Sequence, residues 1–304
     1  MEVKRKRKPT LGVIGGSGPE AGLNVVEKML FIHKVGMGET YMSDKDAVSI
    51  ILMQDPGIGG PHGTWDLGDP NDEAFLKLWE KVTCLIRKLD AIDVDYFCIA
   101  CNTLHVLESK IRKWMIEENV TAHFVSIVES TKTAIVRNYN ENILKPSPEY
   151  RIPSNENYKP LIDSSFVRSN IGKGKGGKNR IAILGSLITC DITGSSPYKA
   201  LFDESDLECV IIEEEKRKQI QCLISETKRR GPSSDLQNKF SSFVNERFVD
   251  EFNTRTDYIV LACTELPLLL SQKERNKLES LGIITIDPNF VLAEEMLRVG
   301  GYLS

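Results

Sequence analysis

The sequence has no long apolar run and no marked excess of charge of one sign. No stretch approaches the ~18 consecutive apolar residues of a membrane span, and no apolar segment follows the charges of the amino terminus, so we expect neither a span nor a secretory signal. The 43 acidic and 39 basic side chains leave a net charge of −4, too little positive field to hold nucleic acid or an anionic membrane surface. We therefore predict a cytoplasmic protein that acts on a small molecule rather than on nucleic acid or a membrane.

Cysteine is also sparse, with seven residues scattered over 304. This is not the dense framework of a disulfide-stabilised scaffold, so we expect free thiols, buried or reactive.

The length predicts two domains. The basic run from Lys4 to Lys8 has no interleaved aromatic residue, so a solvated tail is favoured over a nucleic-acid arm or nuclear address.

Short β-branched apolar runs alternate with longer stretches of helical character, the pattern of βα units around a buried parallel sheet. Each half of the sequence has four such runs. They begin at Leu11, Ser49, Tyr96 and His123 in the first half and at Arg180, Leu207, Tyr258 and Ile283 in the second.

The third runs of the two halves are similar residue by residue. DYFCIACNT begins at Asp95 and DYIVLACTE at Asp257, which places Cys101 and Cys263 at equivalent positions. A duplicated α/β unit explains this match, and it predicts that the two cysteines lie at equivalent strand ends. Ligands bind outside the carboxyl ends of parallel strands, so two such ends that face each other would form one cleft between two domains.

A glycine-rich loop, GGSGPEAG from Gly15 to Gly22, lies between the first predicted strand and a helix. Read as G-x-G-x-x-A it is similar to a dinucleotide fingerprint, but the acid that should follow after ~20 residues comes much later, at Asp55. We therefore favour a small carboxylate held by the backbone N–H groups of this loop. A tight turn without a ligand is the alternative.

Cys101 and Cys263 each end an apolar run and precede short polar residues that suit the start of a helix. The positive end of a helix favours a thiolate, so we predict that both are nucleophiles or bases. Cys84, Cys98, Cys209 and Cys222 are interpreted as small buried hydrophobes.

A metal or disulfide site is the alternative use of the same sulfurs. Cys98 and Cys101 have C-x-x-C spacing with His105 nearby, but the second half has Val260 at the place of Cys98, so we expect no metal. His105 either orients the neighbouring thiol or is a satisfied core histidine. The stretch from Asp55 to Asp69 is a candidate lid over the strand ends.

With these motifs, the sequence resembles the aspartate/glutamate racemase superfamily, and within it the aspartate racemase branch. The most specific matches are GVIGGSGPEA, ACNTLH, LACTELP and IDP, in this order. The resemblance implies a PLP-independent, cofactor-free enzyme with two pseudo-symmetric, doubly wound α/β domains, an active site in the cleft between them, and a homodimer. It also implies that each fourth strand crosses into the other domain, giving domains of 1–122 plus 285–304 and of 123–284, with a flexible insertion at about 138–179.

The resemblance further implies the roles of individual residues. Cys101 and Cys263 are placed on opposite sides of the substrate, Cys263 on the L face and Cys101 on the D face. The implied substrate contacts are Gly16, Ser17, Gly18, Gln54, Asn102, Thr103, Ser186, Lys228, Arg229, Thr264 and Glu265. The family's lysine for the distal carboxylate aligns with Arg229, beside Lys228.

Two departures concern substrate choice. The family usually has Met at the position of Ser17 and Arg at that of Gly63, and the loss of a cation weakens the case for strict aspartate specificity. The second cysteine is followed by Thr264 and Glu265, whereas glutamate racemases typically have Thr-His there. The sequence thus predicts a two-base racemase of aspartate or glutamate. A maleate-type cis-trans isomerase and a catalytically silent protein that binds an acidic ligand are the alternatives.

Overall fold

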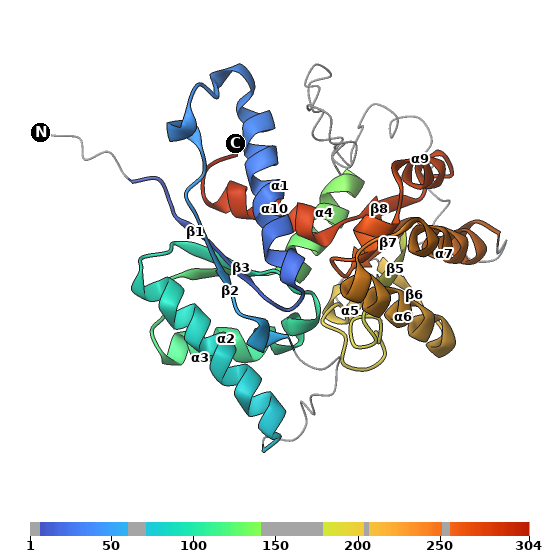
Figure 1. Ribbon diagram of the computed structural model, residues 1–304, viewed down its shortest axis with the longest axis horizontal. Helices are drawn as coiled ribbons and strands as arrows, with labels where there is room; N and C mark the ends of the chain where they lie inside the picture. The colour runs from blue at the N-terminus through green and yellow to red at the C-terminus, as the bar shows by residue number, and fades with distance from the viewer. Residues whose placement is uncertain (1–6, 60–70, 141–178, 204–206, 251–255, 304) are drawn as a thin grey trace, which may run out of the picture. The chain divides into compact units, whose positions relative to one another are not determined.

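A computed structural model describes residues 7–59, 71–140, 179–203, 207–250 and 256–303. The chain divides into two compact units (Figure 1). Unit 1 comprises Met1–Ser130 and Asn289–Ser304, and unit 2 comprises Thr131–Pro288. None of the helices in these described ranges is long and apolar enough to cross a membrane.

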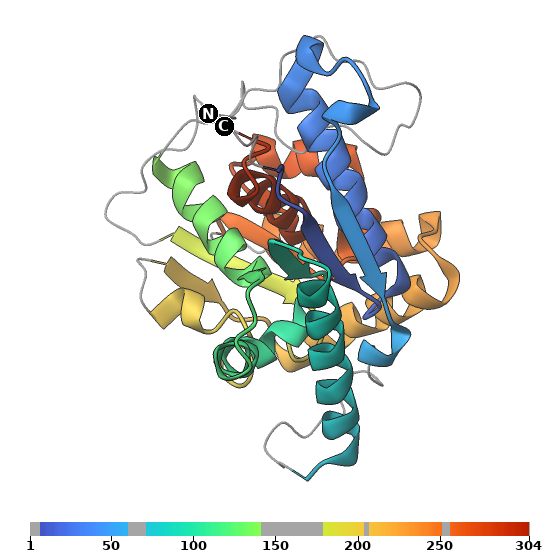
Figure 2. The same ribbon diagram turned by 90° about the vertical axis from the view of Figure 1, so that its left-hand side faces the viewer.

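Unit 1 contains a four-stranded parallel sheet in the order β2-β1-β3-β4. Figure 2 shows β1 and β2 side by side with their arrowheads at the same end. The strands are β1 (Leu11–Gly15), β2 (Ile50–Gln54), β3 (Tyr96–Ile99) and β4 (His123–Val125). The helices are α1 (Pro19–Met37), α2 (Glu73–Ala91), α3 (Glu108–Glu117) and α10 (Pro288–Val299), with shorter turns η1 (Gly38–Thr40), η2 (Asp44–Asp46), η3 (Pro56–Ile58) and η4 (Thr103–Leu107).

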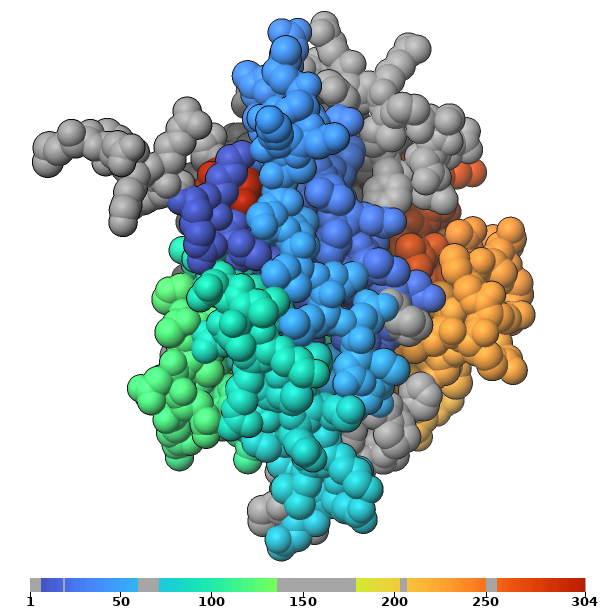
Figure 3. Space-filling model, turned by 60° about the vertical axis from the view of Figure 1, so that its left-hand side comes forward, coloured from blue at the N-terminus to red at the C-terminus, as the bar shows by residue number. Residues whose placement is uncertain are grey.

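Helix α2 shows how the sequence builds the core of unit 1. Asp72 caps it by accepting a hydrogen bond from the Phe75 backbone N–H at 2.6 Å. Its buried apolar side chains recur every three or four residues, which directs one face of the helix onto the sheet. The sheet contributes Ile14 and Phe97 to the same core. The strand β2 lies at the edge of the sheet, with four partly buried residues and the exposed Gln54, and its part of the chain, in light blue, reaches the surface in Figure 3.

Unit 2 repeats this plan with a second parallel sheet in the order β6-β5-β7-β8. Its core lies between the sheet and the helices that pack on it, with Phe240 and Ile259 fully buried. The strands are β5 (Asn179–Gly185), β6 (Leu207–Val210), β7 (Tyr258–Ala262) and β8 (Ile284–Ile286). The helices are α5 (Ala200–Asp203), α6 (Glu214–Arg230), α7 (Ser234–Asn245), the π-helix η5 (Glu246–Asp250), α8 (Leu266–Leu269) and α9 (Gln272–Ser280). Helix α4 (Ile127–Asn140) begins in unit 1 and continues into unit 2.

The structure confirms all eight predicted strands and shows the internal repeat in its hydrogen bonds. Asp95 accepts a hydrogen bond from the Thr10 backbone N–H at 2.7 Å, and Asp257 accepts one from the Arg180 backbone N–H at 2.8 Å. Each aspartate thus ties the start of its unit's third strand to the start of the first. The two sheets therefore share strand order and local anchoring.

The expected crossing of the fourth strands is wrong. β4 pairs with β3, and β8 pairs with β7, so each fourth strand completes the sheet of its own half. Residues 123–130 accordingly belong to unit 1 and residues 285–288 to unit 2. The segment that returns to unit 1 is helix α10 rather than a strand. Most of the expected insertion, residues 141–178, lies outside the described residues, as do Gly63 and most of the candidate lid.

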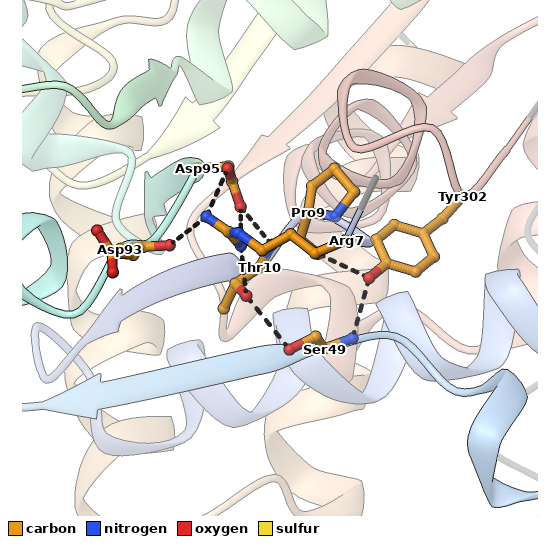
Figure 4. A network of polar contacts seen from close by, with 7 residues as sticks. All are labelled: Arg7, Pro9, Thr10, Ser49, Asp93, Asp95 and Tyr302. Carbon is orange, nitrogen blue, oxygen red and sulfur yellow. Dashed lines mark hydrogen bonds and ion pairs between the residues drawn. The ribbon is translucent and has the colours of Figure 1, made fainter. Parts of the chain in front are cut away.

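The described end of the basic run takes part in the fold of unit 1. Arg7 donates to both carboxylate oxygens of Asp95, at 2.8 and 3.0 Å, and to the Asp93 carbonyl (Figure 4). Tyr302 donates its hydroxyl hydrogen to the Pro9 carbonyl at 2.7 Å. Arg7 is therefore engaged in an intramolecular bidentate ion pair, although its side chain is still 57% exposed.

Candidate active site

The Cys101 thiol lies just after β3, in a turn that precedes η4. It is 8% exposed, and its Sγ donates a hydrogen bond to the Ser17 hydroxyl at 3.1 Å. Ser17 belongs to the glycine-rich loop that connects β1 to α1. The parallel pairing of β1 with β3 brings these two carboxyl ends together, so residues far apart in the sequence meet at one edge of the sheet.

The glycine-rich loop has a backbone that only glycine adopts without strain. Gly16 has φ of +124°, and an added Cβ would lie 2.1 Å from the Asp55 carbonyl oxygen. Gly18, the residue before α1, has φ of +107°. This conformation turns the chain sharply between β1 and α1 and places Ser17 against Cys101.

His105 is held as one neutral tautomer beside Cys101. Its Nδ1 lies 2.8 Å from the Cys101 carbonyl oxygen, and its Nε2 lies 3.2 Å from the Ile127 backbone nitrogen. A carbonyl only accepts and an N–H only donates, so the hydrogen must be on Nδ1. Burial lowers the pKa of His105, against an opposing effect of Glu108, and the ring stacks on Phe124. His105 is therefore a satisfied core histidine that also anchors the Cys101 turn to the start of α4.

The Cys263 thiol occupies the equivalent place in unit 2, directly after β7, and is partly exposed. Its Sγ donates to Glu265 Oε2 at 2.9 Å, and the Thr264 hydroxyl donates to the same oxygen at 3.0 Å. The other oxygen, Oε1, lies 3.8 Å from Lys228 Nζ, and the Glu265 side chain is 7% exposed. A buried carboxylate paired with a lysine thus stands directly against the thiol.

Lys228 and Arg229, near the carboxyl end of helix α6, have different partners and different exposure. Lys228 approaches Glu265, whereas Arg229 pairs with Glu226 at 2.6 Å and its side chain is 72% exposed. The structure therefore brings Lys228 to the carboxylate that contacts Cys263, although the family lysine aligns with Arg229. Successive residues of a helix project about 100° apart, so the two cations point to different sides.

Solved structures with the same fold include three racemases or racemase homologues. Aspartate racemase from Picrophilus torridus matches with a TM-score of 0.62 and 18% identity over 96% of this chain and 94% of that chain. An aspartate racemase homologue from Pyrococcus horikoshii gives 0.60 and 16% over 97% and 100%. A glutamate racemase isoform from Bacillus anthracis gives 0.52 and 12% over 98% and 85%.

The chain has the aspartate/glutamate racemase fold. No family model matches it.

Within this racemase fold, the remaining predicted contacts lie at the carboxyl ends of the strands or in the turns that follow. Gln54 ends β2, and its Oε1 lies against the backbone of Gly15 and Gly22, where neither glycine has room for a Cβ. Asn102 is buried after Cys101, and Thr103 begins η4. Ser186 follows β5 and shares a hydrogen bond of 2.9 Å between its hydroxyl and that of Thr189.

A helical segment begins shortly after each thiol, as the sequence predicts. After Cys101 comes the 3-10 turn η4, and after Cys263 the single turn α8. The turn η4 leads directly into α3, whereas α8 ends at Leu269. The side-chain partners of the two thiols are Ser17 and Glu265.

The racemase-fold units contain seven free cysteines. Cys98 is fully buried, and burial raises the pKa of its thiol. Burial also raises the pKa of Cys209 to about 11. Cys84 and Cys222 are exposed, so their assignment as buried hydrophobes is wrong: both lie on the solvent side of an amphipathic helix. Across the described ranges, no cluster of His, Cys, Asp and Glu is suited to bind a metal.

The sequence did not predict the hydrogen bonds of three cysteine side chains. It treated Ser17 and Glu265 as substrate contacts and did not predict that they are hydrogen-bond partners of the two thiols. The short separation of Glu265 from Cys263 was an available signal, because a turn brings side chains two residues apart together. It also left Cys190 without a role, although its buried sulfur accepts a hydrogen bond from the Gly185 N–H at 2.9 Å.

Proposed function

We propose that the protein is a cofactor-independent racemase of an acidic amino acid, aspartate or glutamate. The observation that carries the proposal is the pair of thiols at equivalent strand ends, each hydrogen-bonded to a polar side chain. Cys98 of β3, three residues before Cys101, is by contrast fully buried in the core. The fold shared with aspartate racemases supports the same reaction class.

In the proposed reaction, one cysteine acts as base and the other as acid. The thiolate of one cysteine takes the proton from the α-carbon, and the electron pair of the broken C–H bond stays on the substrate as a carbanion. The thiol of the other cysteine then delivers its proton to the opposite face of the same carbon and becomes a thiolate. Both thiols must therefore reach one α-carbon. The resemblance assigns the L face to Cys263 and the D face to Cys101.

The surrounding residues have separate tasks in this scheme. Backbone N–H groups of the loop through Gly16 and Gly18 would hold the α-carboxylate and stabilise the charge that builds on it. Lys228, which approaches the Glu265 carboxylate beside Cys263, would meet the distal carboxylate. The names of two matched structures, an aspartate racemase and an aspartate racemase homologue, support aspartate as the first substrate to test.

The decisive experiment follows proton exchange at the α-carbon in deuterated water. We expect L-aspartate to gain deuterium and to yield D-aspartate, and we expect Cys101→Ser and Cys263→Ser each to abolish turnover. Cys222→Ser, which alters an exposed cysteine, is the matched control and should retain full activity. Full racemisation by either single active-site variant would refute the two-base scheme. Fumarate formation from maleate without any D-amino acid would indicate the cis-trans isomerase instead.

We further propose that the racemase acts in the cytoplasm as a homodimer, as the resemblance implies. Light scattering should give twice the chain mass of 34.1 kDa.

A further inference from the structure

The two thiols have chemically different hydrogen-bond partners. The Cys101 Sγ–H points to the hydroxyl of Ser17, a group that can accept a hydrogen bond or, after rotation, donate one. The Cys263 Sγ–H points to the carboxylate of Glu265, which can only accept while it is ionised. A thiolate can therefore be stabilised by its partner at Cys101 but not at Cys263.

The Glu265 carboxylate has two further neighbours besides the Cys263 thiol. Lys228 Nζ lies 3.8 Å from Oε1, and the Thr264 hydroxyl donates to Oε2. An ordinary carboxyl group releases its proton near pH ~4.3 and an ordinary thiol near pH ~8.5, so a proton shared by the two groups resides on sulfur at neutral pH. A Cys263 thiolate would also place two negative charges 2.9 Å apart in a largely buried turn.

We propose that Glu265 is a positioning residue that keeps the hydrogen on Cys263 in the resting protein. Cys263 is then the resting acid, and Cys101 is the resting base. This division of roles rests on the proposed function, whereas the location of the hydrogen on Cys263 does not.

The proposal has a consequence for turnover. When Cys263 gives its proton to the carbanion, its S–H bond breaks and the electron pair remains on sulfur as a thiolate beside the Glu265 carboxylate. This form is unfavourable, so the free enzyme returns to the resting form by taking a proton from water at Cys263 and releasing one from Cys101. Under the resemblance's assignment of faces, the resting form accepts the D enantiomer.

Alkylation of Cys263 by iodoacetamide tests the proposal without any measurement of activity. Thiolates react and thiols do not, so the rate at pH 7 reports the thiolate fraction. Removal of a like charge within ~4–6 Å shifts such an equilibrium by about tenfold or more, and we expect Glu265→Gln to accelerate labelling at Cys263 by that factor. Labelling is read by mass spectrometry of the Cys263 peptide in a background in which the exposed Cys84 and Cys222 are replaced by serine.

Glu226→Gln is the matched control, because Glu226 lies in the same unit and pairs with Arg229 and Arg230 rather than with a thiol. It should leave the rate at Cys263 unchanged. An unchanged or slower rate in a folded Glu265→Gln protein would overturn the proposal, and so would equal acceleration by Glu226→Gln. Glu265→Asp, which restores a carboxylate, should return the rate towards that of the parent.

A second measurement does not depend on the folding of Glu265→Gln. The difference Raman spectrum between the parent and Cys263→Ala at pH 7 should contain the S–H stretching band of one thiol. Its absence would mean that Cys263 rests as a thiolate, which contradicts the proposal.

Kinetics separate a failure of this inference from a failure of the proposed function. Enantiomers have equal free energies, so kcat/KM must be the same in both directions, but Glu265→Gln should raise the KM for the D enantiomer relative to the L enantiomer. If no amino acid is racemised, the racemase proposal fails while the labelling and Raman results still decide where the hydrogen lies.

Discussion

The buried His105 should make the stability of unit 1 depend on pH in the mildly acidic range. The residue is 4% exposed. Its Nδ1 lies 2.8 Å from the Cys101 carbonyl oxygen, and its Nε2 accepts a hydrogen bond from the Ile127 backbone N–H at 3.2 Å, a combination that suits only the neutral form. Protonation would place a second N–H against the N–H of Ile127 and break that hydrogen bond. Burial accordingly lowers the pKa of His105, with Glu108 opposing this effect and Arg112 adding to it.

The sign of the effect follows from proton binding. An unfolded chain protonates histidine below pH ~6.5, whereas the folded protein does not until the pH reaches the lowered pKa, so the unfolded state binds more protons between these two values. The contribution of His105 is therefore complete above pH ~6.5 and is lost as the pH falls towards its folded pKa. Within that window the slope approaches about 1.4 kcal/mol per pH unit.

The test compares the parent with His105→Asn by urea unfolding at several pH values. Tryptophan emission reports unit 1, because Trp79 and Trp114 lie there and no tryptophan occurs between residues 131 and 288. Asparagine can still donate to the Cys101 carbonyl but leaves the Ile127 N–H unsatisfied, which should cost about 1–3 kcal/mol at pH 8.

Between pH 6.5 and 5, the free energy of unfolding should fall more steeply for the parent than for this variant. The contributions of carboxylates cancel in the comparison. His123→Gln, which removes an exposed ring, is the control and should retain the slope of the parent. Equal slopes in the parent and in His105→Asn would refute the reasoning.

Two further substitutions test the geometry of the site. Gly16→Ala forces a Cβ to within 2.1 Å of the Asp55 carbonyl oxygen at a positive φ, so we expect a loss of more than about 1–3 kcal/mol in urea unfolding together with at least tenfold lower racemisation. Lys228→Met should raise the KM for aspartate at least tenfold, whereas Arg229→Met, which alters a largely exposed side chain, should leave it within twofold. Equal effects of the two α6 substitutions would contradict the assignment of Lys228 to the Glu265 side of the helix.

Local sequence patterns determined the strands and the repeat. The central strands β1 and β7 are apolar runs that are buried along their whole length, and such a run can be recognised in the sequence without knowledge of its neighbours. The match around Cys101 and Cys263 likewise placed two thiols at equivalent strand ends, because a strand's register fixes where its carboxyl end lies. The glycine-rich loop was predicted for the same local reason, since only glycine adopts the backbone that Gly16 requires.

Tertiary structure alone decided the long-range contacts around the two thiols. The partner of Cys101 comes from a loop more than eighty residues earlier, and the cation next to Glu265 comes from another helix. Neither contact has a local sequence signal, because both depend on which strands are neighbours and on how a helix is rotated. The same holds for the fourth strands, whose partners are set by long-range pairing. The sequence by itself thus determined which two thiols to consider and placed Glu265 two residues from Cys263, whereas the packing of distant segments decided that Ser17 meets Cys101 and that Lys228 meets Glu265.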